Sequence, residues 1–239
     1  MDTRPGTNLY AGSASTVAYQ ELKTWLMLGE APLGVRLREE RIAERIGVSR
    51  TPVREALLRL HTERLLERHP EGGYRVSAPS TDAIRGLYDV RRALELFGLR
   101  IGFERGHDLD ALRVLRDEWL VVDVGGPAGR RLDPEFVLLD EDFHARLAAA
   151  AGNTQLTEEL RRINERIRPV RSHDFLTEGR IATTVEQHVG ILDAVLASDA
   201  AGAADQLDRH ILESQQVCEA AVALTLERML SIGATDPRW

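Results

Sequence analysis

Apolar side chains recur at helical spacing along most of the chain. In residues 14–29 (ASTVAYQELKTWLMLG) they lie largely on one side of a helix, at Val17, Leu22, Trp25, Leu26 and Leu28. From residue 81 onward the same period recurs, with no convincing alternating strand. The six helices predicted there lie near residues 81–105, 108–122, 133–151, 154–173, 179–198 and 200–231. The pattern predicts a mainly α-helical protein.

Turn-forming residues separate these predicted helices. Breaks fall at Gly106, in the run VGGPAGRRLDP at residues 124–134, and at residues 177–179. Gly152 suits the position after a helix end, and Asn153 suits the N-cap of the next helix. Six amphipathic helices in roughly 150 residues favour an antiparallel bundle, in which sites are built from facing side chains.

Residues 37–60 (LREERIAERIGVSRTPVREALLRL) have a different organisation. They predict a helix, a tight turn and a second helix. Ala43 lets the two helices approach, Gly47 permits the turn, and Val53 buries the second helix against the first. Ser49 is a plausible N-cap of the second helix. The segment predicts a helix-turn-helix.

Short strands flank this predicted helix-turn-helix. The segment LGVRL at residues 33–37 alternates briefly, and residues 65–68 and 74–77 form a hairpin joined by HPEGG. The hairpin is the wing of a winged helix-turn-helix. Gly73 at its tip lets the backbone approach the minor groove or phosphates, or simply permits a tight turn.

Arg50 and Arg54 are four residues apart, so both lie on one face of the second helix. A helix that presents guanidinium groups from its first turns suits the DNA major groove. There arginine bonds bidentately to guanine or contacts phosphates. We therefore expect these two arginines to bind DNA.

The run GVSRTPVREAL resembles the winged helix-turn-helix of the GntR family of bacterial transcription regulators. The resemblance implies that Arg50 and Arg54 contact DNA and that Ser49 and Thr51 lie near phosphates. The chain departs from the family at Arg64, where relatives usually carry a glycine.

A second departure concerns Glu40, where some relatives carry an arginine that reaches DNA. We expect Arg38 to substitute for it.

Net charge is distributed unevenly along the chain. The whole chain carries −7, yet residues 36–75 hold ten arginines and seven glutamates. Local charge governs DNA affinity, because each neutralised phosphate releases counterions. We expect only the N-terminal third of the chain to bind DNA.

The composition, 43% hydrophobic and 29% charged, includes no apolar run long enough to span a membrane. Residues 1–13 lack the plan of a signal peptide and predict a disordered lead. The single cysteine, Cys218, excludes an internal disulfide and suits a reducing compartment. These features predict a cytoplasmic protein with no membrane partner.

Four residues of the predicted bundle form a candidate metal site. Asp140 and His144 are spaced to share one helix face, and His188 and His210 lie twenty-two residues apart, which suits two antiparallel neighbouring helices. One carboxylate and three imidazoles suit a divalent transition metal, with zinc first and nickel or manganese next. The alternative is four separate histidine and aspartate residues, hydrogen-bonded or on the surface.

The runs DEDFHARLAAAAGN, EQHVGILDAVLASDAAGA and DRHI resemble the FCD effector domain of the FadR-like subgroup, with six helices as in its VanR branch. In its metal-binding members an aspartate and three histidines occupy the positions of the four candidates. The resemblance divides the chain into a DNA-binding domain, residues 14–78, and an effector-binding and dimerisation domain, residues 79–232.

Arg91 and Glu95 match an RxxxE pattern that is common in such effector domains. Arg91 either holds the carboxylate of an effector bidentately or forms only an intrahelical salt bridge with Glu95. Arg92 is the second candidate for the effector contact.

These observations predict a DNA-binding transcriptional regulator and not an enzyme. We expect a repressor, because repressors are commoner than activators in the family that the chain resembles. It binds a double-stranded, pseudo-palindromic operator as a homodimer and responds to a small organic acid. Three alternatives remain: the metal itself is the signal, the metal is purely structural, or the site is that of a metal-dependent hydrolase.

Overall fold

The computed structural model describes residues 13–27, 31, 35–78, 80–126, 129, 131–172 and 174–235. The predicted lead up to residue 12, the predicted helix position Leu28 and the first two residues of the predicted strand 33–37 lie outside these residues. The chain divides into two compact units, the first comprising residues up to 78 together with residues from 226 onward, and the second comprising residues 79–225. Each unit is described by itself.

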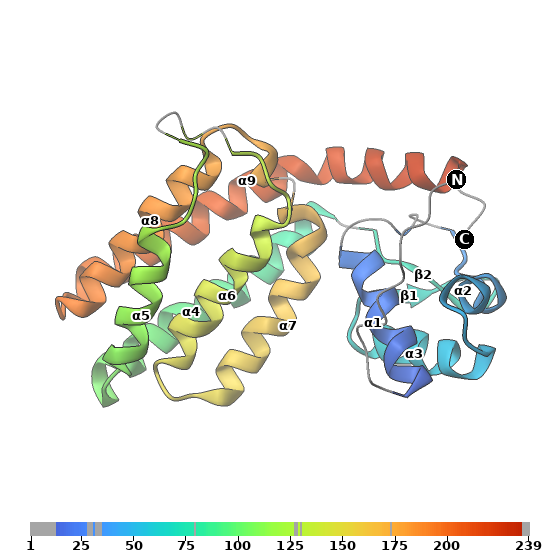
Figure 1. Ribbon diagram of the computed structural model, residues 1–239, viewed down its shortest axis with the longest axis horizontal. Helices are drawn as coiled ribbons and strands as arrows, with labels where there is room; N and C mark the ends of the chain where they lie inside the picture. The colour runs from blue at the N-terminus through green and yellow to red at the C-terminus, as the bar shows by residue number, and fades with distance from the viewer. Residues whose placement is uncertain are drawn as a thin grey trace. The chain divides into compact units, whose positions relative to one another are not determined.

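The first unit is a winged helix-turn-helix, as predicted (Figure 1). Its elements are α1 (Ala14–Met27), α2 (Glu39–Ile46), α3 (Arg50–Thr62), β1 (Leu66–Arg68) and β2 (Tyr74–Val76). The two strands pair antiparallel, with Leu66 opposite Val76. Leu37 extends this wing, because its N–H donates to the carbonyl of Tyr74 over 2.8 Å.

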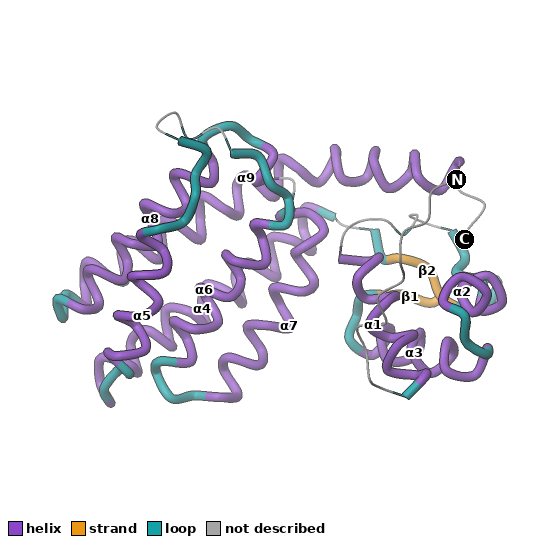
Figure 2. The backbone as a smooth tube through the Cα atoms, viewed as in Figure 1, coloured by secondary structure: helices purple, strands orange, loops and turns teal. Residues whose placement is uncertain are grey.

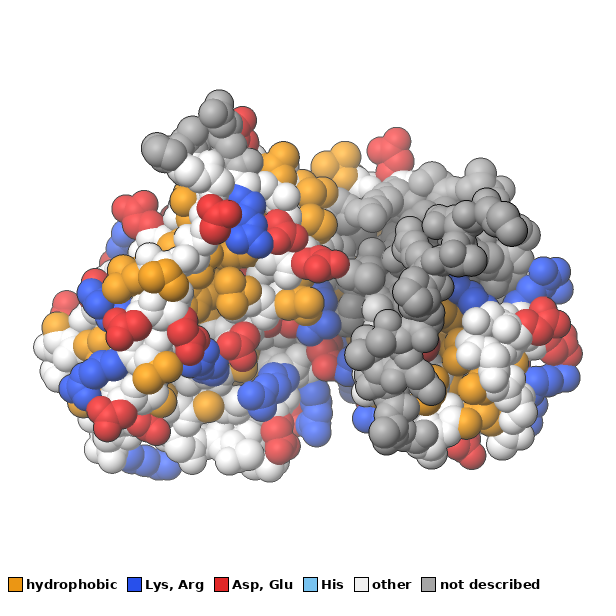
Figure 3. Space-filling view, viewed as in Figure 1, with side chains coloured by type: hydrophobic (Ala, Val, Ile, Leu, Met, Phe, Trp, Pro, Cys, Tyr) orange, Lys and Arg blue, Asp and Glu red, His pale blue; other side chains and the backbone are white. Residues whose placement is uncertain are grey.

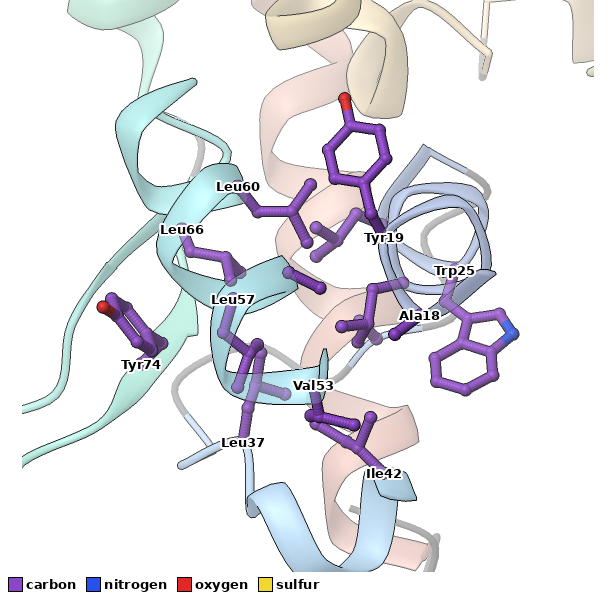
Figure 4. Packing of buried hydrophobic residues seen from close by; sticks show 14 of the residues in the cluster. Ala18, Tyr19, Trp25, Leu37, Ile42, Val53, Leu57, Leu60, Leu66 and Tyr74 are labelled. Atoms are coloured by element: carbon purple, nitrogen blue, oxygen red, sulfur yellow. The ribbon is translucent and has the colours of Figure 1, made fainter. Parts of the chain in front are cut away.

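One apolar face of α3 packs against α1. Figure 4 shows Val53, Leu57 and Leu60 of α3 directed into the same core as Ala18 and Tyr19 of α1. All five are buried. Full burial of an aliphatic side chain of this size contributes about 1.5–3 kcal/mol, so this face fixes α3 in the unit and leaves its opposite face free.

Two residues with left-handed backbone follow the two helices of the helix-turn-helix, Gly47 in the turn after α2 and Arg64 after α3. Gly47 ends α2 with φ +78°, and its N–H donates to the carbonyl of Ala43 over 2.9 Å. Arg64, where the resemblance to GntR regulators implies a glycine, has φ +61°. An L-residue is disfavoured in this region by about 1–2 kcal/mol, so the departure from the family sequence strains the backbone after α3.

Substitutions at Arg64 and at Gly47 are expected to change the free energy of unfolding in opposite directions. Arg64→Gly relieves the strain and should raise the free energy of unfolding by about 0.5–1 kcal/mol, because part of the gain is lost to glycine's freedom in the unfolded chain. Gly47→Ala introduces the same strain and should lower it by about 1–2 kcal/mol. Urea denaturation measures both, and a loss of stability in Arg64→Gly would contradict the assignment of strain.

The second unit is a helical bundle, drawn as a tube in Figure 2. Within residues 81–235, as far as they are described, six α-helices occur, as predicted. They are α4 (Thr81–Arg105), α5 (Leu109–Leu120), α6 (Phe136–Ala149), α7 (Thr154–Arg171), α8 (Arg180–Leu196) and α9 (Ala200–Thr235). A short 3-10 helix, η1 (Asp174–Leu176), precedes α8.

Side-chain caps define two of the helix starts, and the one at Asn153 was predicted from the sequence. Ser80 is the N-cap of α4, and its Oγ accepts a hydrogen bond from the N–H of Ala83 over 3.2 Å. Asn153 is the N-cap of α7, and its Oδ1 accepts from the N–H of Leu156 over 3.1 Å. These bonds satisfy N–H groups that the helices leave unpaired.

The bundle core is unusual in its charged content. α5 packs on α8, and α6 packs on α7 and α4. The visible outer face of this unit carries acidic and basic side chains side by side (Figure 3). Among its described residues, nine side chains with ring nitrogens, guanidiniums or carboxylates are buried: Arg91, Glu95, Asp140, Glu141, His144, Arg171, Asp174, His188 and His210. No described helix is long and apolar enough to cross a membrane.

Candidate metal centre and nucleic-acid interface

The structure brings the four predicted metal ligands together. Asp140 and His144 project from α6, His188 from α8 and His210 from α9. Each is at most 1% exposed, and one ligand atom from each lies within 4.8 Å of the others. Residues from three helices thus converge on one buried point.

The distances between these atoms suit a shared ion. The Nε2 atom of His210 lies 3.1 Å from Nε2 of His144 and 3.2 Å from Nε2 of His188. Asp140 Oδ1 lies 3.7 Å from Nε2 of His188. Two nitrogens that each lie about 2.1 Å from one ion are about 3.0–3.4 Å apart, so the spacing fits metal coordination.

Hydrogen bonds at the far ring nitrogens fix the tautomers of two histidines. His144 donates from Nδ1 to Oε2 of Glu95 over 2.5 Å. His210 donates from Nδ1 to Oε1 of Gln187 over 2.7 Å, while the amide nitrogen of Gln187 donates to Glu213. With protons held on Nδ1, the Nε2 lone pairs face one another. Facing lone pairs cannot bond to each other, and a cation between them satisfies both.

The electrostatics favour the same protonation states. Burial raises the pKa of Asp140, but Arg171, which forms an ion pair with this carboxylate, and His144 and His188 outweigh it, and the pKa lies well below its usual range. Burial and the neighbouring histidines hold the pKa of His188 and of His210 well below the usual range. A carboxylate and neutral imidazoles are the forms that bind metal.

Glu95 has a role that the sequence did not reveal. Its two oxygens accept from different residues, Oε1 from Nε of Arg91 over 2.6 Å and Oε2 from His144. Burial raises the pKa of Glu95, but the opposite effect of His144 and Arg91 is larger. The pKa of Glu95 therefore falls to about 2. Glu95 therefore stays ionised and orients a predicted ligand. Its spacing from Arg91 was the only signal in the sequence.

The two arginines predicted to contact an effector differ in position. Arg91 is fully buried, and beyond its bond to Glu95 its Nη1 and Nη2 find no partner among the described residues. The side chain of Arg92 is 41% exposed, and its Nη2 donates to Oδ2 of Asp208 over 2.8 Å. Arg91 therefore keeps buried donors beside the ligand set, whereas Arg92 is paired nearer the surface.

The first unit gathers most of the predicted DNA contacts around one groove of about 490 Å³. Four predicted residues line it: Arg38, Arg50, Arg54 and Gly73. Arg36 also lines this groove, although the sequence analysis did not single it out. Ser49 and Thr51 are exposed at the start of α3, where Ser49 occupies the N-cap position without a side-chain capping bond.

Gly73 has φ +83°, so the wing tip turns in the left-handed region that glycine prefers. A Cβ added there would lie 3.4 Å from Nε of Arg36. The wing tip and the Arg36 side chain are therefore close together.

Two glutamates lie within this arginine groove. Glu39 accepts from Nε of Arg54 over 3.0 Å and from Nη2 of Arg54 over 2.9 Å. Glu40 pairs with Nη1 of Arg50 over 2.8 Å. Arg50, Arg54 and Glu40 are largely exposed, and Glu39 is half-buried, so the pairs contribute little to stability. They do oppose DNA phosphates, which must compete for the same guanidiniums.

Removing the charge of Glu40 is expected to tighten DNA binding. Glu40→Gln removes the closer of the two carboxylates paired with Arg50 and removes repulsion worth on the order of 1 kcal/mol, which is about a five-fold gain in affinity. Fluorescence anisotropy at fixed salt measures it. Asp110→Asn, in an exposed carboxylate of the second unit, is the control and should change nothing. Unchanged binding by Glu40→Gln would remove Glu40 from the DNA surface.

Comparison with known proteins supplies the family. The model of the bacterial regulatory proteins of the gntR family matches residues 14–76, and that of the FCD domain matches residues 86–213. The chain belongs to the GntR family.

Relatives of this GntR protein are regulators of transcription. The Nta operon transcriptional regulator of Aminobacter aminovorans is 35% identical over 158 residues, 66% of the chain and 72% of that protein. The HTH-type transcriptional repressor GlaR of Escherichia coli is 27% identical over 213 residues, 86% of the chain and 96% of that protein. This GntR protein is accordingly a DNA-binding regulator and not an enzyme, which removes the hydrolase alternative.

A solved structure of similar fold is the putative transcriptional regulator GntR from Rhodococcus sp. RHA1. It is 26% identical, with a TM-score of 0.64, and the alignment covers 86% of the chain and 98% of that structure. Both units of this GntR protein therefore follow the family architecture.

Proposed function

We propose that this GntR regulator represses transcription as a homodimer on a pseudo-palindromic operator, and that a small organic acid bound in the second unit changes its DNA affinity. One recognition helix reads only a half-site, which is the reason for expecting a dimer. The observation that carries the acid proposal is the buried ligand set beside Arg91, whose Nη1 and Nη2 find no protein partner in the described part of the chain.

In this proposal Asp140, His144, His188 and His210 hold a divalent ion, with zinc first and nickel or manganese next. The ion supplies positive charge for a carboxylate oxygen of the acid. Arg91 binds the acid through its free donors, and Glu95 holds both Arg91 and His144 in place. The aromatic rings of Phe143 and Trp119, which pack on His188, exclude water from one side.

The acid would act by population shift between two arrangements of the DNA-binding units. Its effect on operator affinity is limited to its differential affinity for those arrangements. A ten-fold preference corresponds to about 1.4 kcal/mol, within reach of one or two charge-assisted hydrogen bonds.

The placement of the ligands also favours a second candidate, a purely structural ion. The four side chains come from α6, α8 and α9, so a bound ion would cross-link three helices. The metal as the signal itself is the third possibility.

Operator binding in four conditions separates these candidates. Anisotropy with the protein's own promoter region is measured for metal-loaded and chelated protein, each with and without a panel of small organic acids. An acid response that chelation abolishes supports the proposal. An acid response that survives chelation, with lower thermal stability, makes the ion structural. A response to metal alone makes the metal the signal.

A further inference from the structure

A second buried arginine accompanies Arg91. Arg171 lies in the last turn of α7 and is 1% exposed, while Arg91 of α4 is fully buried. Arginine is rarely buried without full pairing, because desolvating a guanidinium is costly. Two such side chains beside one ligand set therefore need a chemical reason.

Each guanidinium reaches the ligand set through one carboxylate. Arg171 donates from Nη2 to Oδ2 of Asp140, itself a ligand. Arg91 donates to Glu95, which accepts from His144. The two arginines thus approach the ligand set through separate carboxylates.

Both guanidiniums keep unused donors. Nη1 and Nη2 of Arg91, and Nε and Nη1 of Arg171, are buried with no acceptor in the described part of the chain. Tyr88, whose ring lies 5.6 Å from the Arg91 guanidinium, does not serve them, because its hydroxyl is shared with Ser214 and Cys218. Buried donors require an acceptor, and four nitrogens on two guanidiniums offer room for more than one carboxylate.

The sum of the buried charges shows how many negative charges a bound ligand would have to supply. Arg91 and Arg171 balance Glu95 and Asp140. Two adjacent ion pairs are each neutral: Arg168 with Glu141, and Arg180 with Asp174. With neutral imidazoles the site has no net charge until a divalent ion is added, which leaves two uncompensated positive charges. Two buried charges of one sign require compensation, and a single dianion supplies it.

We infer that the effector of this regulator is a dicarboxylate, with one carboxylate at the ligand set and the second on the free donors of Arg91 and Arg171. The inference rests on the proposed function and specifies its ligand. A monocarboxylate would leave one positive charge and one group of donors unsatisfied, so it binds more weakly.

Matched acids test the inference directly. Succinate is compared with butyrate, and malate with 2-hydroxybutyrate, because each pair differs by one carboxylate at constant carbon number. Isothermal titration calorimetry uses the full chain loaded with zinc, at pH 7.5, where all these carboxylates are ionised. We expect the dicarboxylate of at least one pair to bind roughly 10- to 100-fold more tightly than its partner.

Variants at Arg171 test its role apart from folding. Arg171→Gln removes one positive charge, so the ratio of dicarboxylate to monocarboxylate affinity should fall toward one. Arg171→Lys keeps the charge and should retain most of the ratio. Zinc content per chain is measured in each variant, and Arg91→Gln repeats the test if Arg171→Gln does not fold. An unchanged ratio in both glutamine variants, with zinc bound, would overturn the assignment of the arginines.

The two levels of failure give different results. If a monocarboxylate binds as tightly as its dicarboxylate partner, the inference is wrong while the proposed acid response stands. If none of the four acids binds zinc-loaded protein and none alters DNA binding, both are wrong for these acids, and the buried donors serve bound water.

Discussion

Replacing both Arg50 and Arg54 with alanine is expected to abolish specific operator binding, and each single change is expected to weaken it about 10- to 100-fold. A bidentate arginine contact with guanine is worth about 1–3 kcal/mol. The two side chains lie on the exposed face of α3, 56% and 66% exposed, and line one groove. Their removal should therefore leave the fold intact.

Anisotropy with operator and with scrambled DNA of equal length, at matched salt, separates specific from general loss. Arg113→Ala is the matched control, because it removes an exposed arginine, 59% accessible, from the second unit. Retained specific affinity in the double variant would contradict the DNA-binding assignment. A uniform loss on both DNAs would assign the arginines to phosphates rather than bases.

Removing one metal ligand is expected to have the second large effect. Asp140→Asn keeps the shape of the side chain but removes the charged ligand, so zinc content should fall from about one per chain to near zero after dialysis. Binding to the folded state alone stabilises by about 2.7 kcal/mol at a metal concentration of one hundred times Kd. Chelation should therefore lower the melting temperature of the natural protein but not that of Asp140→Asn.

Mass spectrometry of metal content, with thermal denaturation before and after chelation, measures both effects. His188→Ala should lose metal as well, although it also opens a cavity beside Phe143. His107→Ala is the control, since His107 lies outside the ligand set, and it should keep the metal. Full metal content in Asp140→Asn would remove Asp140 from the ligand set, and no metal in the natural protein would return all four side chains to a structural role.

The helix boundaries could be predicted because their signals are local. Gly152, with φ +74°, and the N-cap Asn153 mark the start of α7 without any information from distant residues. The wing was likewise readable, since glycines in HPEGG permit its turn. Glycine and capping residues act on their own backbone, so the sequence alone contains them.

The meeting of the four metal ligands followed from residue type and spacing together with the family resemblance. Their surroundings did not follow. Arg171 is a basic residue at a helix end, where such side chains usually reach solvent, yet it is buried against Asp140. Gln187 orients His210 from another helix. Helical periodicity identifies a face but not which residues of two faces meet, so such contacts between helices needed the structure.

On the DNA-binding surface, too, the sequence predicted some features and others needed the structure. Arg50 and Arg54 could be placed on one face from their spacing. Their pairing with Glu40 and Glu39 could not, because it depends on the angle between α2 and α3. Arg36 was missed because it lies before the helix-turn-helix and reaches the groove only through the fold of the wing.

Thermodynamic linkage provides the most direct test of the central claim, that an organic acid controls operator affinity through the metal-containing bundle. Calorimetry measures the Kd of the tightest-binding of the four acids for zinc-loaded protein, free and saturated with operator. Coupling is reciprocal, so the account predicts that operator changes the acid's Kd by the same factor by which the acid changes operator affinity, roughly 5- to 150-fold. An acid Kd that is identical with and without operator would contradict the account.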